Sequence, residues 1–218
     1  MPERVAIVDY RLGNLHSVAQ ACAHVGLAPE ITDDPARIRS ADAVILPGVG
    51  AYEDAMRNLR AGGLADLLRE LAAAGRPLVG ICLGMQLLLD YSEEFGHHEG
   101  LGLVPGAVVR FDAPHEGDRR LKVPQIGWNR IHPAPGADWD ATLLRGTAPG
   151  QHFYFVHSYV ARPADPAVVL ATTTYGHIEF CSSLGYQNIF ASQFHPERSG
   201  EPGLAIYRNL AARLRPAD

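Results

Sequence analysis

Short, uninterrupted apolar runs alternate with helix-like stretches in the first half of the sequence, and this alternation restricts the fold more than any other feature. Strands that are buried on both faces have continuous apolar runs, and parallel strands need a long crossover, usually a helix, between them. The predicted strands span residues 4–9, 42–46 and 77–81. The predicted helices span residues 14–25, 52–74 (with a break at Gly62 and Gly63) and 83–91. This pattern predicts a parallel sheet with helices on both faces.

The second half is rich in strands and ends in a helix. Its predicted strands are bounded by turn residues, which favours antiparallel hairpins, and span residues 103–111, 152–160, 168–174, 177–184 and 189–194. A closing helix is predicted for 205–214 and an exposed hairpin loop for 113–120. We therefore predict a single α/β domain over residues 1–218, with a mostly parallel central sheet flanked by helices and added antiparallel strands in the second half.

The composition excludes several classes of protein. Of the 218 residues, 47% are hydrophobic, and a chain of this size buries roughly 70% of its unfolded surface, which supports a stable core. The net charge of -5, from 19 basic and 24 acidic residues, argues against a nucleic-acid partner. No apolar run is long enough to predict a membrane span or a secretion signal. Three cysteines without CxxC spacing predict a reducing, cytoplasmic setting.

Residues 77–86, PLVGICLGMQ, carry the strongest chemical signal. An apolar strand meets a helix at Cys82, and Gly80 and Gly84 lie two residues to either side. This is a nucleophile-elbow pattern with cysteine in the serine position, a turn so tight that only very small neighbours avoid a clash. The thiol would lie at the N-terminus of the next helix, where the helix dipole favours a thiolate. A buried structural cysteine is the alternative interpretation.

A candidate base follows the last predicted strand. In the segment QFHPE, His195 comes directly after residues 189–194, so it would share an edge of the sheet with Cys82 if the two strands are parallel. Glu197 can accept a hydrogen bond from one imidazole nitrogen while the other nitrogen faces the thiol. A structural histidine is the alternative, but the combination with the GxCxG elbow favours a Cys82, His195 and Glu197 triad.

The segment PGVG supplies a second candidate element, because it also follows a strand. Backbone N–H groups of Gly48, Val49 and Gly50 could approach a reacting carbonyl, and the N–H of Leu83 is the other natural oxyanion donor. A plain strand-to-helix turn and a phosphate loop are the alternatives; no Lys-Ser/Thr follows, which disfavours the phosphate loop. Together these elements predict acyl transfer through a thioester.

The segments PGVG, GICLGMQ and QFHPE together resemble the class I, triad-type glutamine amidotransferase family. The resemblance implies that Cys82 attacks the carboxamide of glutamine, that His195 acts as base and then acid, and that Glu197 orients it. Ammonia leaves, and the glutamyl thioester is hydrolysed to glutamate. The same resemblance implies that a substrate-binding group holds the amino-acid end of glutamine, namely Gln86, His157, Ser158 and Tyr159. It implies no cofactor.

Further blocks, DYRLGNLHSV, PQIGWN and YFVHSY, are similar to members of this family that work with a cyclase subunit, a (β/α)8 barrel. The resemblance implies a heterodimer in which ammonia passes to the cyclase without release, since most ammonia in water at pH 7 is unreactive ammonium. On this basis Gly13, Asn14 and Trp128 are the predicted docking residues, although Trp128 could equally be a core aromatic.

Two other functions stay open at this point. A stand-alone γ-glutamyl hydrolase or cysteine peptidase would use the same triad, and a non-catalytic scaffold could keep the fold without the chemistry. No metal site is expected, because His97, His98 and Glu99 lie among glycines in a segment typical of a solvated loop. Cys22 and Cys181 are predicted to be packed thiols in a helix and a strand.

Overall fold

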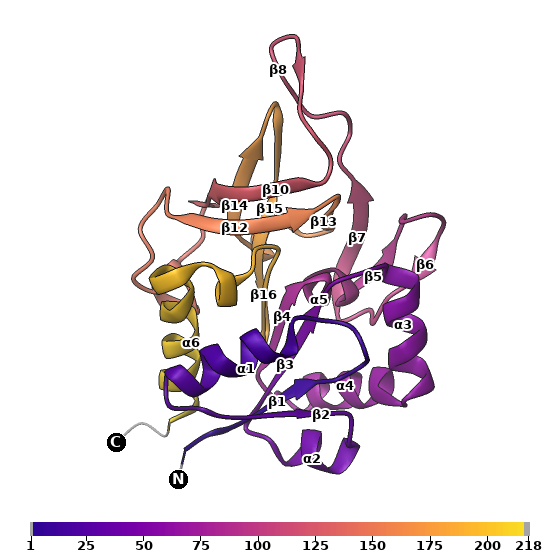
Figure 1. Cartoon of the computed structure of the whole chain (residues 1–218), viewed down its shortest axis with the longest axis vertical. Helices are drawn as coiled ribbons and strands as arrows, with labels where there is room; N and C mark the ends of the chain where they lie inside the picture. Colours follow the sequence, from indigo (N-terminus) through magenta and orange to yellow (C-terminus); the bar gives the residue numbers. More distant parts are fainter. Residues whose placement is uncertain (1, 216–218) are drawn as a thin grey trace.

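The computed structural model describes residues 2–215 and contains a large mixed sheet that runs through the molecule (Figure 1). Five neighbouring strands at one end are all parallel, in the order β2 (Ala28–Thr32), β1 (Arg4–Val8), β3 (Ala43–Gly48), β4 (Leu78–Cys82) and β16 (Ile189–Ser192). Their helices are α1 (Leu15–His24), α2 (Pro35–Ser40), α3 (Tyr52–Ala61), α4 (Leu64–Ala73), α5 (Leu83–Leu87) and α6 (Gly200–Leu214). The parallel sheet predicted from the first half is therefore confirmed.

Beyond β16 the sheet continues mainly with antiparallel strands. In order these are β15 (Ile178–Tyr186), β13 (Tyr159–Pro163), β7 (Val104–Arg110), β5 (Leu89–Ser92) and β6 (His98–Glu99), with β14 (Val169–Tyr175) and β11 (His132–Pro133) branching from β15. A separate pair consists of β10 (Gln125–Arg130) and β12 (His152–His157). Residues 2–215 also contain three short 3-10 helices, η1 (Trp139–Ala141), η2 (Pro166–Val168) and η3 (Pro196–Arg198). The added antiparallel strands of the second half are thus also confirmed.

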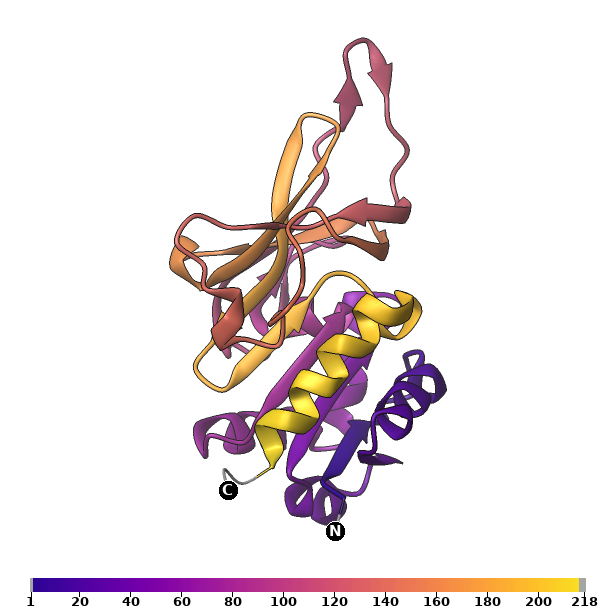
Figure 2. The ribbon, with the colours of Figure 1, turned by 90° about the vertical axis from the view of Figure 1, so that its left-hand side faces the viewer.

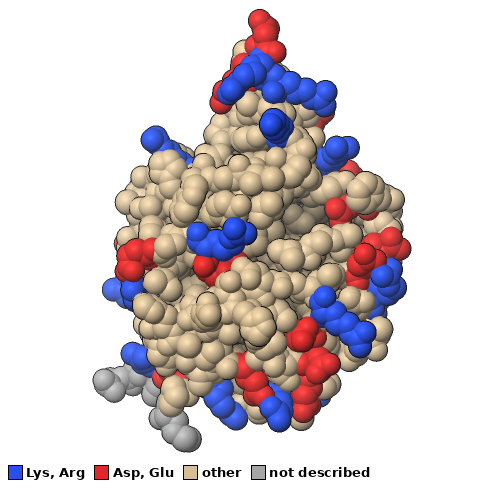
Figure 3. Space-filling view, viewed as in Figure 1, with Lys and Arg blue, Asp and Glu red and all other residues tan. Residues whose placement is uncertain are grey.

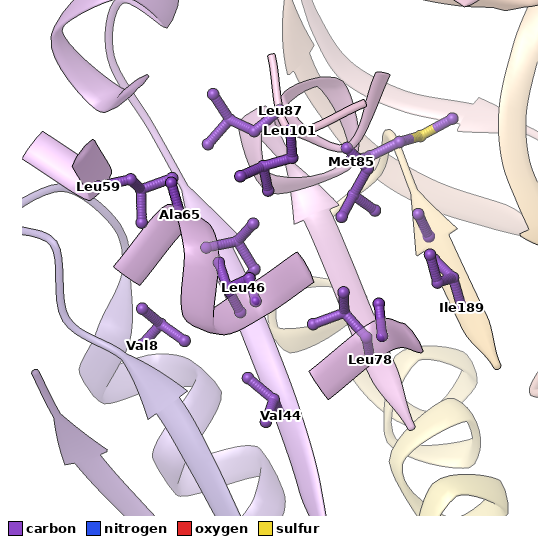
Figure 4. Packing of buried hydrophobic residues seen from close by; sticks show 14 of the residues in the cluster. Val8, Val44, Leu46, Leu59, Ala65, Leu78, Met85, Leu87, Leu101 and Ile189 are labelled. Atoms are coloured by element: carbon purple, nitrogen blue, oxygen red, sulfur yellow. The ribbon is translucent and has the colours of Figure 1, made fainter. Parts of the chain in front are cut away.

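Alternate side chains of the central strands point into two different cores. On β1, Val5 and Ile7 pack in the cluster that includes α1 and α6, whereas Ala6 and Val8 pack against α2, α3 and α4. Figure 2 shows α6 lying across one face of the sheet with α1 beside it, and Figure 4 shows the second core, to which Leu46 and Leu59 both belong. Because both faces are covered, the strands are apolar throughout, as the sequence indicates.

The predicted helix over residues 83–91 is wrong in its second half. Helix α5 ends at Leu87, and Leu89–Ser92 forms strand β5, which pairs in parallel with β7. The backbone carbonyls of Leu87 and Leu88 accept hydrogen bonds from the N–H groups of Leu101 and Leu103, so they do not continue a helix. Tertiary pairing decides this segment, and a short apolar run fits either structure.

The strand predicted over residues 152–160 is two strands that belong to different sheets. The strand is interrupted at Ser158, so that β12 pairs with β10 while β13 pairs with β7. The alternating pattern continues across the break, which hides it from the sequence. Strands β2 and β10 and helix α2 were not predicted, and α6 begins at Gly200, five residues before its predicted start.

The predicted hairpin loop at 113–120 forms an exposed hairpin, β8 (His115–Glu116) and β9 (Arg119–Arg120). Both ribbon views show it projecting from the body of the molecule, and Figure 3 shows charged side chains gathered at this tip. Within residues 2–215, no helix combines the length and the apolar character needed to cross a bilayer.

Gly84 follows the turn between β4 and α5, and it can be tested directly. A Cβ atom at Gly84 would lie 1.7 Å from the backbone oxygen of Leu46. We expect Gly84→Ala to lower the free energy of unfolding by about 3 kcal/mol, because a backbone atom of β3 has to move. Gly62→Ala is the matched control, since its nearest non-neighbouring atom would be 3.4 Å away and its φ is -85°. Urea denaturation measures both, and equal midpoints for the two variants would contradict the clash.

Candidate active site

Cys82 occupies the sharp turn that the sequence predicts between a strand and a helix. It is the last residue of β4 and has φ 54° and ψ -110°, a left-handed conformation that a residue with a Cβ adopts only under strain. A Cβ atom at Gly80 would lie 2.8 Å from the Leu88 side chain, which explains this small neighbour. Because α5 has only five residues, its dipole is smaller than the predicted nine-residue helix would give.

His195 and Glu197 are brought to the same edge of the sheet by β16, which pairs in parallel with β4 at Ser192 and Ile81. The Nδ1 atom of His195 lies 2.8 Å from Oε1 of Glu197, and both side chains are almost completely buried. The other nitrogen, Nε2, is buried and has no hydrogen-bond partner among the described residues. One imidazole nitrogen is therefore held by the carboxylate, and the other is free for chemistry.

The charges around His195 favour its protonated form. Burial alone would lower the pKa of the imidazole, but the Cys82 and Glu197 side chains outweigh it and raise the pKa of His195 to about 10. The other two thiols behave differently, because burial raises the pKa of Cys22 and of Cys181 to about 12. These two cysteines are packed, free thiols in α1 and β15, as predicted.

The loop at residues 48–50 lies next to Cys82, because Gly48 is the register partner of Cys82 across the β3–β4 ladder. A Cβ atom at Gly48 would lie 2.3 Å from the hydroxyl oxygen of Tyr10, so only glycine fits there. Gly50 has φ 116°, a conformation open to glycine alone, and Val49 between them is 40% exposed. The loop is therefore close to the sulfur and free on its outer side.

A cavity of about 260 Å³ opens over Cys82 and collects most of the predicted substrate-binding and oxyanion residues. Its lining comprises Val49, Gly50, Cys82, Leu83, Gln86, Glu94, Pro124, Val156, His157, Ser158 and Tyr159. His195, Glu197 and Gly48 do not line it and lie buried next to it. Glu94, Pro124 and Val156 were not predicted as site residues: Pro124 and Val156 stand in the segments PQIGWN and YFVHSY without a signal of their own, and Glu94 stands in none of the quoted segments.

Two predicted substrate residues are fixed by one backbone carbonyl. The oxygen of Tyr159 accepts hydrogen bonds from Nε2 of Gln86 at 3.0 Å and from Nδ1 of His157 at 2.9 Å. Burial lowers the pKa of His157 to about 4 despite that bond, so its imidazole is neutral at pH 7. Its Nε2 atom is buried without a described partner and is an acceptor beside the cavity.

Glu94 brings a carboxylate to the cavity. Its Oε2 atom accepts a hydrogen bond of 2.6 Å from the backbone N–H of Tyr52, at the start of α3. The side chain is held in place by this bond while it lines the same space as Cys82 and Gln86. A fixed negative charge in a small cavity suits a ligand with an ammonium group.

The predicted docking residues lie in different environments. Asn14 is turned toward the buried carboxylate, with its Nδ2 atom 3.5 Å from Oε1 of Glu197, and Gly13 before it has φ 133°. Trp128 is 56% exposed on β10 and packs edge-on against Tyr154, whose ring centroid lies 6.1 Å away. The core alternative for Trp128 is therefore wrong. Arg198 covers the Tyr154 ring at 4.4 Å from its centroid.

The solvated loop predicted around residues 97–99 is partly wrong, because His98 and Glu99 form strand β6, which pairs with β5 at an edge of the sheet; His97 comes just before this strand. No group of three or more His, Cys, Asp or Glu side chains in the described part of the chain is arranged to hold a metal ion.

Comparison with known proteins agrees with this geometry. The family model described as glutamine amidotransferase class-I matches residues 6–213, and the chain therefore belongs to this family of glutamine-hydrolysing α/β proteins. Its relatives include imidazole glycerol phosphate synthase subunit HisH of Syntrophotalea carbinolica, 47% identical over 94% of this chain and 98% of that protein. HisH of Moorella thermoacetica is 48% identical over 98% and 96%. Within the family, the chain belongs with the HisH subunits.

Solved structures share the fold at low sequence identity. PurLQS from Thermotoga maritima has a TM-score of 0.74 and 19% identity and covers 99% of this chain and 100% of that one. A structure described as glutamine amidotransferase has a TM-score of 0.71 and 21% identity, with coverage of 96% and 98%. The predicted fold class, a class I glutamine amidotransferase domain, is confirmed.

The raised pKa of His195 leads to a direct test. Cys82→Ala removes one of the two side chains that raise the pKa of His195, so we expect this pKa to fall in this variant and also in Glu197→Gln. NMR titration of the imidazole measures the change, and Cys22→Ala is the control that should leave it alone. A pKa of His195 that stays at its wild-type value in Cys82→Ala would contradict this electrostatic account.

The same shift sets a pH dependence of stability. Since the pKa of His195 is raised from 6.5 to about 10 in the folded protein, its protonation adds stability that is complete below pH 6.5 and is lost as the pH rises through 10. We expect the free energy of unfolding of the wild-type protein to fall more steeply between these values than that of Glu197→Gln. Urea denaturation at a series of pH values checks the difference.

Proposed function

We propose that the protein is the glutaminase subunit of imidazole glycerol phosphate synthase, an enzyme of histidine biosynthesis. It hydrolyses glutamine to glutamate and ammonia at Cys82 and delivers the ammonia to a cyclase subunit. There the ammonia is used to form imidazole glycerol phosphate and aminoimidazole carboxamide ribotide. The observation that carries the proposal is the convergence of a strained Cys82, a buried His195–Glu197 pair and a glycine loop beside one cavity, in a chain related to HisH subunits.

In the reactive pair the proton of the Cys82 thiol lies on Nε2 of His195, the nitrogen that Glu197 leaves free, in keeping with the raised pKa of His195. The sulfur then attacks the carboxamide carbon of glutamine, and the carbonyl oxygen becomes an oxyanion. The N–H group of Leu83 and those of the 48–50 loop are the proposed donors to this oxygen. His195 gives its proton to the nitrogen of the tetrahedral intermediate, the C–N bond breaks, and ammonia leaves a glutamyl thioester.

A water molecule completes the cycle. His195, now neutral, takes a proton from the water as its oxygen attacks the thioester carbon, and it returns the proton to the departing sulfur. Glutamate and the free thiol result, so protons and atoms balance over the two steps. Glu197 keeps its hydrogen bond with Nδ1 of His195 throughout and stabilises the imidazolium in each step.

Glutamine fits the chemistry of the cavity lining. The carboxamide end lies at Cys82, and the amino-acid end reaches Gln86 and the His157–Tyr159 segment. Glu94 is the proposed partner of the α-ammonium group, because it is the carboxylate in the lining. A volume of about 260 Å³ suits a small amino acid.

The partner subunit is proposed to dock around Trp128 and Tyr154, giving a heterodimer with a (β/α)8-barrel cyclase. Tyr154 links this surface to the site, because its backbone oxygen accepts a hydrogen bond of 2.9 Å from the N–H of His195. Exposed aromatic side chains are favoured interface anchors, and Trp128 is the one exposed tryptophan among the described residues. Asn14, by its contact with Glu197, joins the triad to the segment that carries Gly13.

Alternative functions fit less well. A stand-alone γ-glutamyl hydrolase or cysteine peptidase would share the triad, but the HisH relatives match over 94% and 98% of this chain and are named as synthase subunits. A scaffold without activity would not need a strained Cys82 beside Nε2 of His195, an imidazole nitrogen without a described hydrogen-bond partner. A cytoplasmic location accompanies the proposal and is supported by three free, buried thiols.

Replacing the nucleophile separates the two half-reactions. In the complex with the cyclase subunit, we expect Cys82→Ala to abolish glutamine-dependent synthesis and to retain synthesis from added ammonium salt, because the cyclisation occurs in the partner. Cys181→Ala, a buried thiol in β15, is the matched control and should keep both activities. Product formation from each nitrogen source is the measurement. Retention of glutamine-dependent synthesis by Cys82→Ala would overturn the role of Cys82.

The carboxylate of Glu94 can be neutralised without losing its structural bond. Glu94→Gln keeps an oxygen that accepts from the Tyr52 N–H and removes the charge, so we expect the KM for glutamine to rise about tenfold with a smaller change in kcat. Glu93→Gln, on the exposed neighbour, is the control. Steady-state glutaminase kinetics of the complex decide the matter, and an unchanged KM in Glu94→Gln would exclude the ammonium contact.

A further inference from the structure

Gln193 is a buried polar residue that the triad chemistry leaves without a role. It stands between β16 and His195, has 0% exposure, and its backbone N–H donates to the oxygen of Ser182 at 2.9 Å. A buried amide in a protein interior needs partners for its side-chain oxygen and nitrogen, since leaving one unpaired is costly. Its two partners identify what it does.

The orientation of the Gln193 amide follows from hydrogen-bond chemistry. The Tyr159 carbonyl oxygen can only accept, so the group of Gln86 that faces it at 3.0 Å is the NH2. The same NH2 lies 2.9 Å from the Gln193 side chain, which must therefore present its Oε1 oxygen there. The remaining group of Gln193, its NH2, lies 3.7 Å from Sγ of Cys82. A main-chain carbonyl thus directs an N–H donor at the nucleophile.

The sulfur of Cys82 has one protein acceptor and one uncharged side-chain donor. The backbone oxygen of Val156, 3.7 Å away, accepts from the S–H group and so favours the neutral thiol. The NH2 of Gln193 donates to the sulfur and favours the thiolate. Helix α5 adds little, because it has only five residues.

Besides Glu94, which lines the same cavity, and Glu197, which pairs with His195, the titratable groups near Cys82 come from three other elements. His195 follows β16 and Tyr10 follows β1, and the charge of Cys82 raises the pKa of both. His157 ends β12, and the charge of His195 contributes to lowering its pKa. Of these, His195 is the group that must exchange its proton during turnover. A donor that never titrates would hold the sulfur in one place while that proton moves.

We propose that Gln193 is a positioning residue of this glutaminase: its NH2 donates to the Cys82 sulfur, and its Oε1 fixes Gln86 at the wall of the glutamine cavity. It acts through these two residues and does not itself line the cavity. The inference rests on the proposed function for its kinetic consequences. Its chemical consequence, the reactivity of Cys82, can be measured without turnover.

The test is the pH dependence of Cys82 alkylation by iodoacetamide in the full chain, followed by mass spectrometry. Gln193→Met removes the donor at similar length, so the pH midpoint of alkylation is expected to rise by about half a unit or more. Gln193→Glu is ionised in the alkaline range and repels the thiolate, so its midpoint also rises, and it gives the same readout if the Met variant does not fold. Gln20→Met, on the exposed face of α1, is the matched control. Wild-type midpoints in both Gln193 variants would overturn the proposal.

Glutaminase kinetics of the complex with the cyclase subunit test the contact with Gln86. In Gln193→Met, we expect kcat to fall about tenfold and KM to rise, because both contacts are lost. In Gln193→Glu an oxygen still accepts from Gln86, so kcat falls while KM stays near the wild-type value. An unchanged KM in the Met variant would overturn the Gln86 part. Absence of glutaminase activity in the wild-type complex would instead count against the proposed function and leave the alkylation result standing.

Discussion

The tight turn at Cys82 is the constraint on which the rest of the site depends. A residue with φ 54° and ψ -110° costs on the order of 1–3 kcal/mol, and only a well-packed surrounding holds it there. Close packing around the turn is possible because Gly48, Gly80 and Gly84 have no side chains. A methyl group at any of these positions would overlap with β3, α5 or Tyr10. The strained conformation of Cys82 is therefore maintained by the packing of the whole sheet edge. The backbone conformation of Cys82 sets the position of its thiol.

Hydrogen bonds then give each group around the sulfur a single orientation. Glu197 fixes one nitrogen of His195, and the Tyr159 carbonyl fixes Gln86 and His157. Most of these partners are buried, where a polar contact is strong and an unpaired group is costly. Three buried atoms of the site have no described partner, Nε2 of His195, Nε2 of His157 and Oε2 of Glu197, and the two nitrogens belong to histidines beside the cavity.

Much of this organisation could be predicted from the sequence, because it depends on local patterns. The parallel strands are continuous apolar runs, and the GxCxG and HPE segments place Cys82, His195 and Glu197 at strand ends that meet in the structure. Long-range strand pairing could not be predicted from the sequence. Strand β5 replaces the second half of a predicted helix because it pairs with β7. Glu94 and the carbonyl of Val156 were missed because an isolated acid and a backbone oxygen carry no pattern. Gln193 was within a motif, but only the fold brings it to the sulfur.

The parallel pairing of β4 with β3 and β16 has an evolutionary consequence. Neighbouring strands are held roughly 4.8 Å apart by backbone hydrogen bonds, whatever their side chains. The hydrogen-bonded ladder between these strands therefore sets the spacing of the nucleophile, the base and the glycine loop. Substitutions in the apolar cores change the fraction of folded protein before they change the activity of each folded molecule. During evolution, core residues can therefore be exchanged with an effect on the amount of folded protein, while the catalytic arrangement stays the same.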